Sequence, residues 1–278
     1  MAIDKKTAMP ARVVGIPNLR AAGSCGAADS TPAQSWLKLA TVQHYGRGEA
    51  IIEAGQPLQQ WMAIREGATR LSSRPHGRGE DGDDVPVAIL WFGDVIGWTS
   101  PVGKELARYE VTALTAVSTL TIPKEGIGIT GSAEQLCKAD VFQLYAATAT
   151  RIQDQVSLRL SGNGFQRLVG VLATLAMAAA GGAGQAAARR SGGLHLPMAQ
   201  ALIGSFAGLA RRQTWVYLQQ LAEAGWVSTG HSKLILEAAP AWLQLLAEVE
   251  RSGLDCIATV DACNSTLSRL WHEHQAER

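Results

Sequence analysis

The hydrophobic pattern divides the chain into a part that alternates like strands and a part that repeats like helices. Between residues 40 and 125, short apolar runs alternate with polar residues, as in HYGRGEAIIEAGQPLQQWMAIREGATRLSS, VPVAILWFGDVIGW and YEVTALTAVSTLTIP. Gly48, Gly55 and Gly67 separate the first runs at intervals of 7 and 12 residues. Short strands with turns at this spacing predict a small antiparallel barrel or jelly roll.

The period changes to that of a helix over residues 134–162. Five residues recur there in steps of 4, 3, 4 and 3, which predicts an a/d seam about two heptads long. We expect this seam to join two copies of the chain, although a helix lying on its own barrel would show the same period. The seam residues are Tyr145, Ala149, Ile152, Val156 and Arg159.

Gly162 and Gly164 then flank Asn163, a combination that predicts a helix stop, a hinge and an N-cap for the next helix. The pattern beyond predicts five segments. They are an apolar helix (165–180), a linker (181–193), two short helices (194–227), a small hairpin with its turn near Gly230, and amphipathic helices (240–278).

The two short helices have the pattern of a helix-turn-helix. Leu202, Ile203 and Phe206 form the apolar face of the first helix, and Gly208 supplies the turn. The second helix is predicted from about Ala210 to Ala224, with Gly225 as its C-terminal cap. We expect Val216, Leu218 and Leu221 to pack inward and the first turn to contact DNA bases through Arg211, Arg212, Gln213, Thr214 and Trp215. Trp215 has the alternative of packing against the hairpin.

Composition and charge restrict how this chain can bind DNA and where it can act. The 278-residue chain has a net charge of +1, so nucleic-acid binding has to come from a local patch. Residues 185–237 hold five basic and two acidic residues, which is a modest patch. No run approaches the length of a membrane span, and the N-terminus is a poor signal peptide. We therefore expect a cytoplasmic protein without a membrane partner.

The order of these pieces resembles the CRP/FNR family of bacterial transcription regulators. The resemblance covers roughly residues 38–240 and is carried by six segments in the family's order. They are GRGEAIIEAGQPLQQWMAIREGATRL, FGDVIGW, YEVTALTAVSTLTIP, the helix at 134–162, QRLVGVLATLA and LPMAQALIGSFAGLA.

The resemblance implies an α+β fold with an N-terminal antiparallel β-roll or jelly roll, a long dimerisation helix and a C-terminal winged helix-turn-helix. It divides the chain into an arm (1–35), a sensor roll (36–133), a dimerisation helix (134–162), a winged helix-turn-helix (163–240) and a helical extension (241–278). The implied partners are a second copy, double-stranded DNA with a palindromic operator, RNA polymerase and a small-molecule effector.

The same resemblance places an effector site at the roll turn and on the long helix. The residues at these positions are Gly93, Asp94, Gly97, Trp98, Arg108, Ile152 and Gln153. Where cyclic-AMP-binding members carry an arginine–serine pair for the phosphate, this chain has Ala107 and Arg108, and one step along a strand reverses the side chain. We therefore do not expect cyclic AMP. Trp61, Trp91, Trp98 and Tyr109 can line an apolar ligand pocket or form ordinary core; the cofactor stays unknown.

The DNA-reading helix also departs from the family pattern. Ala199 and Ala210 replace the Ser or Thr that usually begins each short helix. Val216 stands where the family places a base-reading arginine, and Arg212 replaces a common glutamate, so the preferred half-site should differ from the best-known ones. A protein-interaction module that has lost DNA reading is therefore the alternative function.

Other classes find less support in the residues. Four scattered cysteines form no CxxC pair, and no haem or iron–sulfur motif is present. A cupin-type metal enzyme needs several histidines in the roll, but residues 40–125 contain only His44 and His76. We expect that the protein is not an enzyme.

Overall fold

The computed structural model describes residues 40–58, 60–73, 84–97, 106–123, 138–180, 193–196, 198–230 and 233–277. The chain divides into two compact units. One comprises Met1–Arg74 and Leu90–Thr150, and the other comprises Pro75–Ile89 and Arg151–Arg278. The expected N-terminal arm, Cys25, His76, Trp98 and Cys137 lie outside the described residues.

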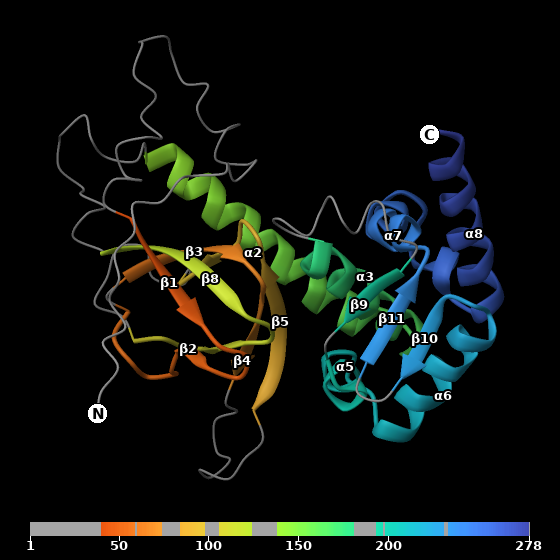
Figure 1. The fold of residues 1–278 in the computed structure, drawn as a ribbon, viewed down its shortest axis with the longest axis horizontal. Coiled ribbons are helices and arrows are strands. Elements are labelled where there is room, and N and C mark those ends of the chain that lie inside the picture. Colours follow the sequence, from red (N-terminus) through yellow and green to blue (C-terminus); the bar gives the residue numbers. More distant parts are fainter. Residues whose placement is uncertain are drawn as a thin grey trace. The chain divides into compact units, whose positions relative to one another are not determined.

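The strand-rich part folds as the alternating pattern predicts. Two four-stranded sheets form, with strand orders β1-β8-β3-β6 and β2-β7-β4-β5 (Figure 1). The strands are β1 (Thr41–Tyr45), β2 (Ala50–Ile52), β3 (Gln60–Glu66), β4 (Ala68–Ser73), β5 (Val85–Trp91), β6 (Val95–Ile96), β7 (Glu110–Ala113) and β8 (Val117–Pro123). The pairs β1–β8, β3–β8, β3–β6, β2–β7 and β4–β7 are antiparallel, which confirms the β-roll.

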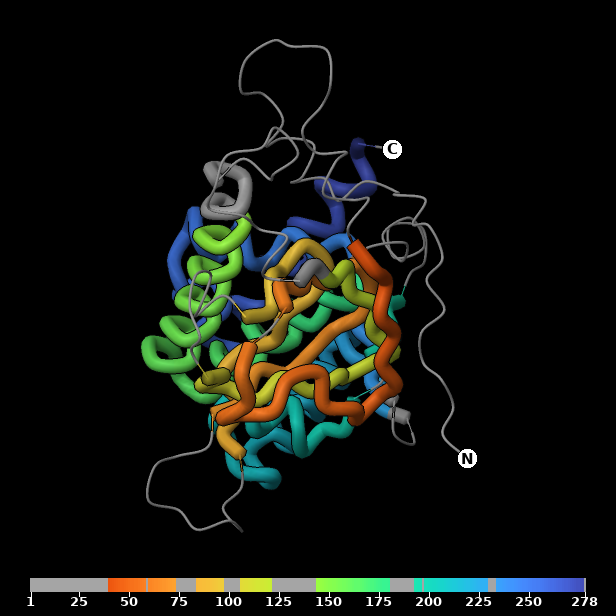
Figure 2. The backbone as a smooth tube through the Cα atoms, turned by 90° about the vertical axis from the view of Figure 1, so that its left-hand side faces the viewer, coloured from red at the N-terminus to blue at the C-terminus, as the bar shows by residue number. Residues whose placement is uncertain are grey.

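The roll is filled by the apolar residues of its strands. Ile64, Ala88, Leu90, Val95 and Ile96 have no exposed surface. Figure 2 shows the strands, coloured orange to yellow-green, wound around this interior. The turn between β3 and β4 requires glycine, because Gly67 has φ +87° and a Cβ there would lie 2.2 Å from the Ala116 carbonyl oxygen.

The long helix α2 (Lys138–Ser161) follows the roll and confirms the predicted change of period. In its first half, the Thr148 hydroxyl accepts a hydrogen bond from the Val95 amide at 3.0 Å. In its second half, the Gln155 side-chain amide donates to the carbonyl and accepts from the amide of Ile89, both at 2.8 Å. Since β5 is the edge strand of its sheet, Gln155 occupies backbone groups that a further strand would otherwise pair.

The second unit contains a three-stranded antiparallel sheet surrounded by helices (Figure 1). Its elements are α3 (Gly164–Ala180), β9 (Gly193–Leu196), α5 (Gln200–Phe206), α6 (Arg211–Glu223), β10 (Val227–Gly230), β11 (Lys233–Glu237), α7 (Ala239–Ser252), η5 (Leu254–Ile257) and α8 (Val260–Ala276). The two short helices followed by a hairpin make this a winged helix-turn-helix.

One segment differs from the prediction. The two helices were expected from residue 194, but Gly193–Leu196 form β9. Leu194 and Leu196 pair with Leu236 and Leu234 of β11, and all four leucines are buried. A strand of four residues has too few positions to show alternation, and its partner lies about 40 residues later, so local pattern gave no sign of it. None of the described helices is long and apolar enough to cross a membrane.

Candidate nucleic-acid interface

The turn between α5 and α6 is set by backbone geometry. The amide of Ala207 bonds to the Ile203 carbonyl, and the amide of Leu209 bonds to the Gly204 carbonyl at 2.9 Å. Gly208, with φ +63°, makes the reversal between the helices. The sequence prediction of Gly208 as the turn residue is therefore confirmed.

A close contact between Gly204 and Thr214 fixes how the two helices cross. A Cβ on Gly204 would lie 2.3 Å from the Thr214 hydroxyl oxygen. Thr214 is 2% exposed, and its hydroxyl donates to the Ala210 carbonyl at 3.1 Å. The expectation that Thr214 contacts DNA is therefore wrong, because its side chain packs under α5.

The opposite face of α6 is open. Arg211, Arg212 and Gln213 are exposed, as a base-reading role requires. Trp215 is 55% exposed and does not pack away against the hairpin, which answers the alternative raised for it. Val216 is 37% exposed, so the prediction that it packs inward is wrong.

The buried stripe of α6 consists of Thr214, Leu218 and Leu221. Leu218 and Leu221 were predicted there, and Thr214 takes the place expected for Val216. Positions three and four apart share one helix face, so a stripe through 214, 218 and 221 leaves Arg212, Trp215 and Val216 on the other side.

Both short helices begin without a side-chain cap. Ala199 and Ala210 adopt the extended cap conformation, but neither provides a hydrogen bond to the helix. The first turn of α6 also contains no acidic residue. Its first amide groups and two arginines therefore present positive charge that suits a phosphate or base edge.

The hinge residues behave as a cap and are also tied down. The Asn163 side chain accepts from the Gln166 amide at 3.0 Å, and the Gln166 side chain accepts from the Asn163 amide at 2.7 Å. This reciprocal pair is a capping box, which confirms Asn163 as N-cap of α3. The same two side chains donate to the carbonyls of Ala258 and Leu254.

Two contacts connect this hinge region with the helix-turn-helix. The ring of Tyr217, on α6, meets that of Phe165 edge to face at 5.6 Å. The Arg159 guanidinium bonds to the Pro86 carbonyl and lies beside Gly208, where its Nε would be 3.7 Å from a Cβ. Burial and the neighbouring Arg167 lower the pKa of Arg159.

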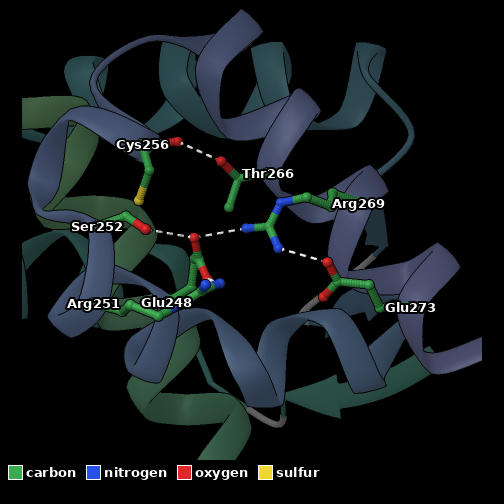
Figure 3. A network of polar contacts seen from close by, with 7 residues as sticks. All are labelled: Glu248, Arg251, Ser252, Cys256, Thr266, Arg269 and Glu273. Carbon is green, nitrogen blue, oxygen red and sulfur yellow. Dashed lines mark hydrogen bonds and ion pairs between the residues drawn. The ribbon is translucent and has the colours of Figure 1, made fainter. Parts of the chain in front are cut away.

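The C-terminal helices pack onto the winged helix-turn-helix. The Trp226 indole donates to the Asn264 side chain at 2.8 Å, and Cys263, Leu267 and Leu270 are buried. A polar network joins α7 to α8 (Figure 3): the Glu248 carboxylate accepts from Ser252 at 2.7 Å and pairs with Arg269 at 2.6 Å.

These partners also fix the charge states in the extension. The Ser252 hydroxyl, with help from Arg251 and Arg269, lowers the pKa of Glu248 against the opposing effect of burial. Burial raises the pKa of the Cys256 thiol, and raises that of Cys263 to about 12. Both cysteines are free thiols.

The expected dimer seam turns toward its own protomer at several positions. Tyr145 is 8% exposed and meets Trp61 edge to face, and Ile152 is 7% exposed. Arg159 bonds to Pro86. Ala149 and Val156 are half-buried. The seam prediction is therefore wrong at Tyr145, Ile152 and Arg159, which are buried or bonded within their own protomer, and it stays a prediction at Ala149 and Val156. The period of a helix does not show which side its own sheet covers.

Two of the expected effector residues line one cavity inside the roll. Gly97 and Arg108 lie at its edge together with Leu58, Leu71 and Tyr109. The cavity measures about 20 Å³. That is room for about one water molecule, whereas pockets for small ligands measure some hundreds of Å³.

The other expected effector residues have structural surroundings. Gly93 and Asp94 form the turn between β5 and β6, where the fully buried Asp94 carboxylate accepts from the Trp91 amide at 2.9 Å. Ile152 is buried and Gln153 is exposed on α2. Trp61 and Trp91 are buried, as the ordinary-core alternative predicts. Among the described residues, no three His, Cys, Asp or Glu side chains are grouped to hold a metal.

Comparison with known families supports this description of the roll. Residues 42–128 match the family model of the cyclic nucleotide-binding domain. None of the curated proteins compared with the chain is significantly similar to it.

Solved structures share the fold over about three quarters of the chain. A CRP/FNR-family transcriptional regulator from Thermus thermophilus is 17% identical, covering 74% of this chain and 98% of its own, with a TM-score of 0.56. FixK2 from Bradyrhizobium japonicum is 20% identical over 74% of this chain and 96% of its own, with a TM-score of 0.56. The c-di-GMP responsive regulator CLP from Xanthomonas campestris is 13% identical over 75% of this chain and 99% of its own, with a TM-score of 0.55. The resemblance found in the sequence is therefore confirmed at the level of the fold.

Proposed function

We propose that this chain, which has the fold of CRP/FNR-family regulators, is a homodimeric transcription regulator that reads DNA through α6. The observation that carries the proposal is the exposed, acid-free first turn of α6, with Arg211, Arg212 and Gln213 facing solvent next to the hairpin wing. A recognition helix of this kind enters the major groove with its N-terminal residues at the base edges. Such a regulator acts in the cytoplasm.

The exposed side chains suit particular bases. Arg211 and Arg212 can each donate two hydrogen bonds to guanine, and Gln213 can pair with adenine. The uncapped amides at the start of α6 suit a phosphate oxygen. Since the local positive charge is modest, base contacts have to supply much of the affinity.

The dimer contact is better placed on the exposed stripe of α2. Its side chains recur in steps of 4, 3, 4 and 3, one position after the seam first expected. Leu160 at its end is 80% exposed, which is unusual for a leucine without a partner. The stripe consists of Ala146, Thr150, Gln153, Ser157 and Leu160. Small residues over most of its length allow two helices to approach closely.

Cyclic AMP is not the effector in this proposal. The cavity beside Gly97 and Arg108 is too small for a nucleotide, and Asp94 is engaged by the backbone of its own turn. The regulator would therefore bind DNA without added nucleotide, or respond to a ligand of a different kind. RNA polymerase remains the expected partner of a regulator bound at a promoter.

The test is selection of bound duplexes from a random DNA pool in moderate salt, with purified protein and no added ligand. We expect an enriched palindrome with half-sites about 10 base pairs apart. Arg211→Ala should then relax one base position in each half-site. Absence of any enriched sequence would contradict ligand-independent reading.

A second candidate function is a protein-interaction module that has lost specific DNA reading. The uncapped Ala199 and Ala210 and the exposed Trp215 favour it. Affinity measured against salt concentration separates the two functions. A reader keeps a gap of about a thousandfold or more between specific and non-specific DNA, whereas a module shows only the salt-dependent binding.

A further inference from the structure

We infer that Trp215 and Val216 read thymine methyl groups beside the base contacted by Arg212. The inference rests on the proposed function and names the kind of DNA sequence that α6 selects: a half-site in which thymine neighbours guanine.

The three side chains share the outward face of α6. Trp215 lies three positions and Val216 four positions after Arg212, so both lie one turn along the helix from the guanidinium and on either side of it. The inward face is occupied by Thr214, Leu218 and Leu221. A ligand that Arg212 contacts is therefore also within reach of Trp215 and Val216.

Their exposure sets these two residues apart. Only five large apolar side chains are markedly exposed within the described residues, and two of them are neighbours at this one point of the chain. Leaving a tryptophan 55% and a valine 37% exposed gives up stabilisation that burial would provide. A contact made only in the bound state explains why apolar residues occupy this face.

The surrounding charge favours DNA over a protein as the occupant. Arg211 and Arg212 precede the apolar pair, and the first turn has no acid. Glu223, the one acidic residue of α6, lies two turns beyond Val216 at the other end of the helix. A basic helix start next to an apolar pair matches a groove lined by phosphates whose floor carries methyl groups.

The chemistry of the major groove supplies the ligand. Thymine is the only standard base that presents a methyl group there, and it is recognised by apolar side chains. Arginine pairs with guanine O6 and N7. An arginine flanked by a valine and a tryptophan therefore selects guanine with thymine beside it.

The experiment replaces thymine by deoxyuridine, which removes the methyl group and keeps the base pair. The operator comes from the selection described above, and dissociation constants are measured by fluorescence anisotropy for duplexes with single replacements. At one or two positions next to a selected guanine, we expect roughly fourfold weaker binding for each contacted methyl group that is removed, since a buried methyl-sized group contributes about 0.8 kcal/mol. Val216→Ala should weaken binding to the thymine duplex and reduce the thymine–uracil ratio to within about twofold. Trp215→Ala should likewise reduce the thymine–uracil ratio at the second contacted thymine.

Arg212→Ala is the matched control from the same helix face. It should weaken binding to both the thymine and the uracil duplex and leave the ratio of the two dissociation constants unchanged. The three replaced side chains are exposed in the folded protein, so the midpoint of thermal unfolding, followed by circular dichroism, should be unaltered.

The outcomes separate the two proposals. A selected operator whose binding ignores uracil, or which lacks thymine beside guanine, overturns the methyl contact and leaves DNA reading intact. A uracil effect that survives in both Val216→Ala and Trp215→Ala also overturns it. A pool without enrichment contradicts ligand-independent DNA reading, on which this inference rests, and points to a protein as the occupant of the apolar pair.

Discussion

At the scale of single residues, the contact between Gly204 and Thr214 decides the geometry of the helix-turn-helix. There is no space for a methyl group on Gly204, since it would meet the Thr214 hydroxyl at 2.3 Å. We expect Gly204→Ala to lower the free energy of unfolding by about 1–3 kcal/mol, the usual cost of overpacking. Chemical denaturation measures it.

The matched control is Gly204→Ala combined with Thr214→Ala. Removing the threonine side chain makes room for the methyl group, so the double variant should be less destabilised than the sum of the single changes. Strict additivity of the two changes would contradict the steric explanation.

Cys263 illustrates how burial controls chemistry at one residue. Because burial raises its pKa to about 12, almost none of the thiolate that alkylating reagents need is present at pH 8. We expect alkylation at Cys263 to be slow in the folded protein and fast after unfolding, as followed by peptide mass mapping. A raised folded pKa also means that the stability contributed by the neutral thiol is complete below about pH 9 and is lost as the pH rises toward 12. Rapid labelling of Cys263 in the native protein would show that the helix pair opens.

At the scale of elements, the network around Glu248 holds α7 against α8. Glu248 is 6% exposed and accepts bonds from charged and hydroxyl groups, so Glu248→Gln should cost about 1–3 kcal/mol in the free energy of unfolding. Glu273→Gln is the control on the same arginine: its side chain is 50% exposed, and surface pairs contribute about 0–1 kcal/mol.

The pH dependence of this network has a definite sign. The folded pKa of Glu248 lies below its ordinary value, so its contribution is present above about pH 4.5 and is lost as the pH falls through the depressed value. The midpoint temperature of thermal unfolding should therefore fall less steeply between pH 6 and pH 3 for Glu248→Gln than for the unaltered chain. Parallel curves would assign the acid sensitivity to other groups.

Elements also show where sequence reasoning succeeds. The long helix, the apolar helix after it, the wing hairpin and the N-cap at Asn163 follow from local signals, because caps, turns and periods lie within a few residues of each other. Strand β9 and the inward direction of Thr214 depend on contacts with residues far away or on the exact rotation of a helix. The expected seam failed for the same reason, since Tyr145 and Arg159 repeat at the right spacing but contact Trp61 and Pro86.

At the scale of the whole molecule, the order of the parts predicted more than any part alone. Each part alone, the roll, the long helix or the helix-turn-helix, occurs in many unrelated proteins. Their order along the chain indicated the fold that solved structures share with TM-scores of 0.55 or more. The effector position was not predictable in this way. The family turn at Gly93 and Asp94 is present, but the cavity beside Gly97 and Arg108 measures only about 20 Å³.

Whole-molecule function finally depends on whether two copies associate through the exposed stripe of α2. Leu160 is the largest apolar group on that stripe and is 80% exposed. Leu160→Glu places a charge where two helices would meet and removes a leucine contact of about 1.5–3 kcal/mol from each protomer. We expect a dimer dissociation constant weaker by about a hundredfold or more, measured by sedimentation equilibrium, and a parallel loss of affinity for a palindromic duplex.

The control is Leu106→Glu, which changes the other strongly exposed leucine of the described chain, at 56% exposure in the roll. It should leave association unchanged, because Leu106 is not part of α2. Ile152→Glu is unsuitable as a test, since it buries a charge and would unfold the helix from its own protomer. If Leu160→Glu remains a dimer while Leu106→Glu dissociates, the two protomers meet through the roll, and the two recognition helices are spaced by that surface instead of by α2.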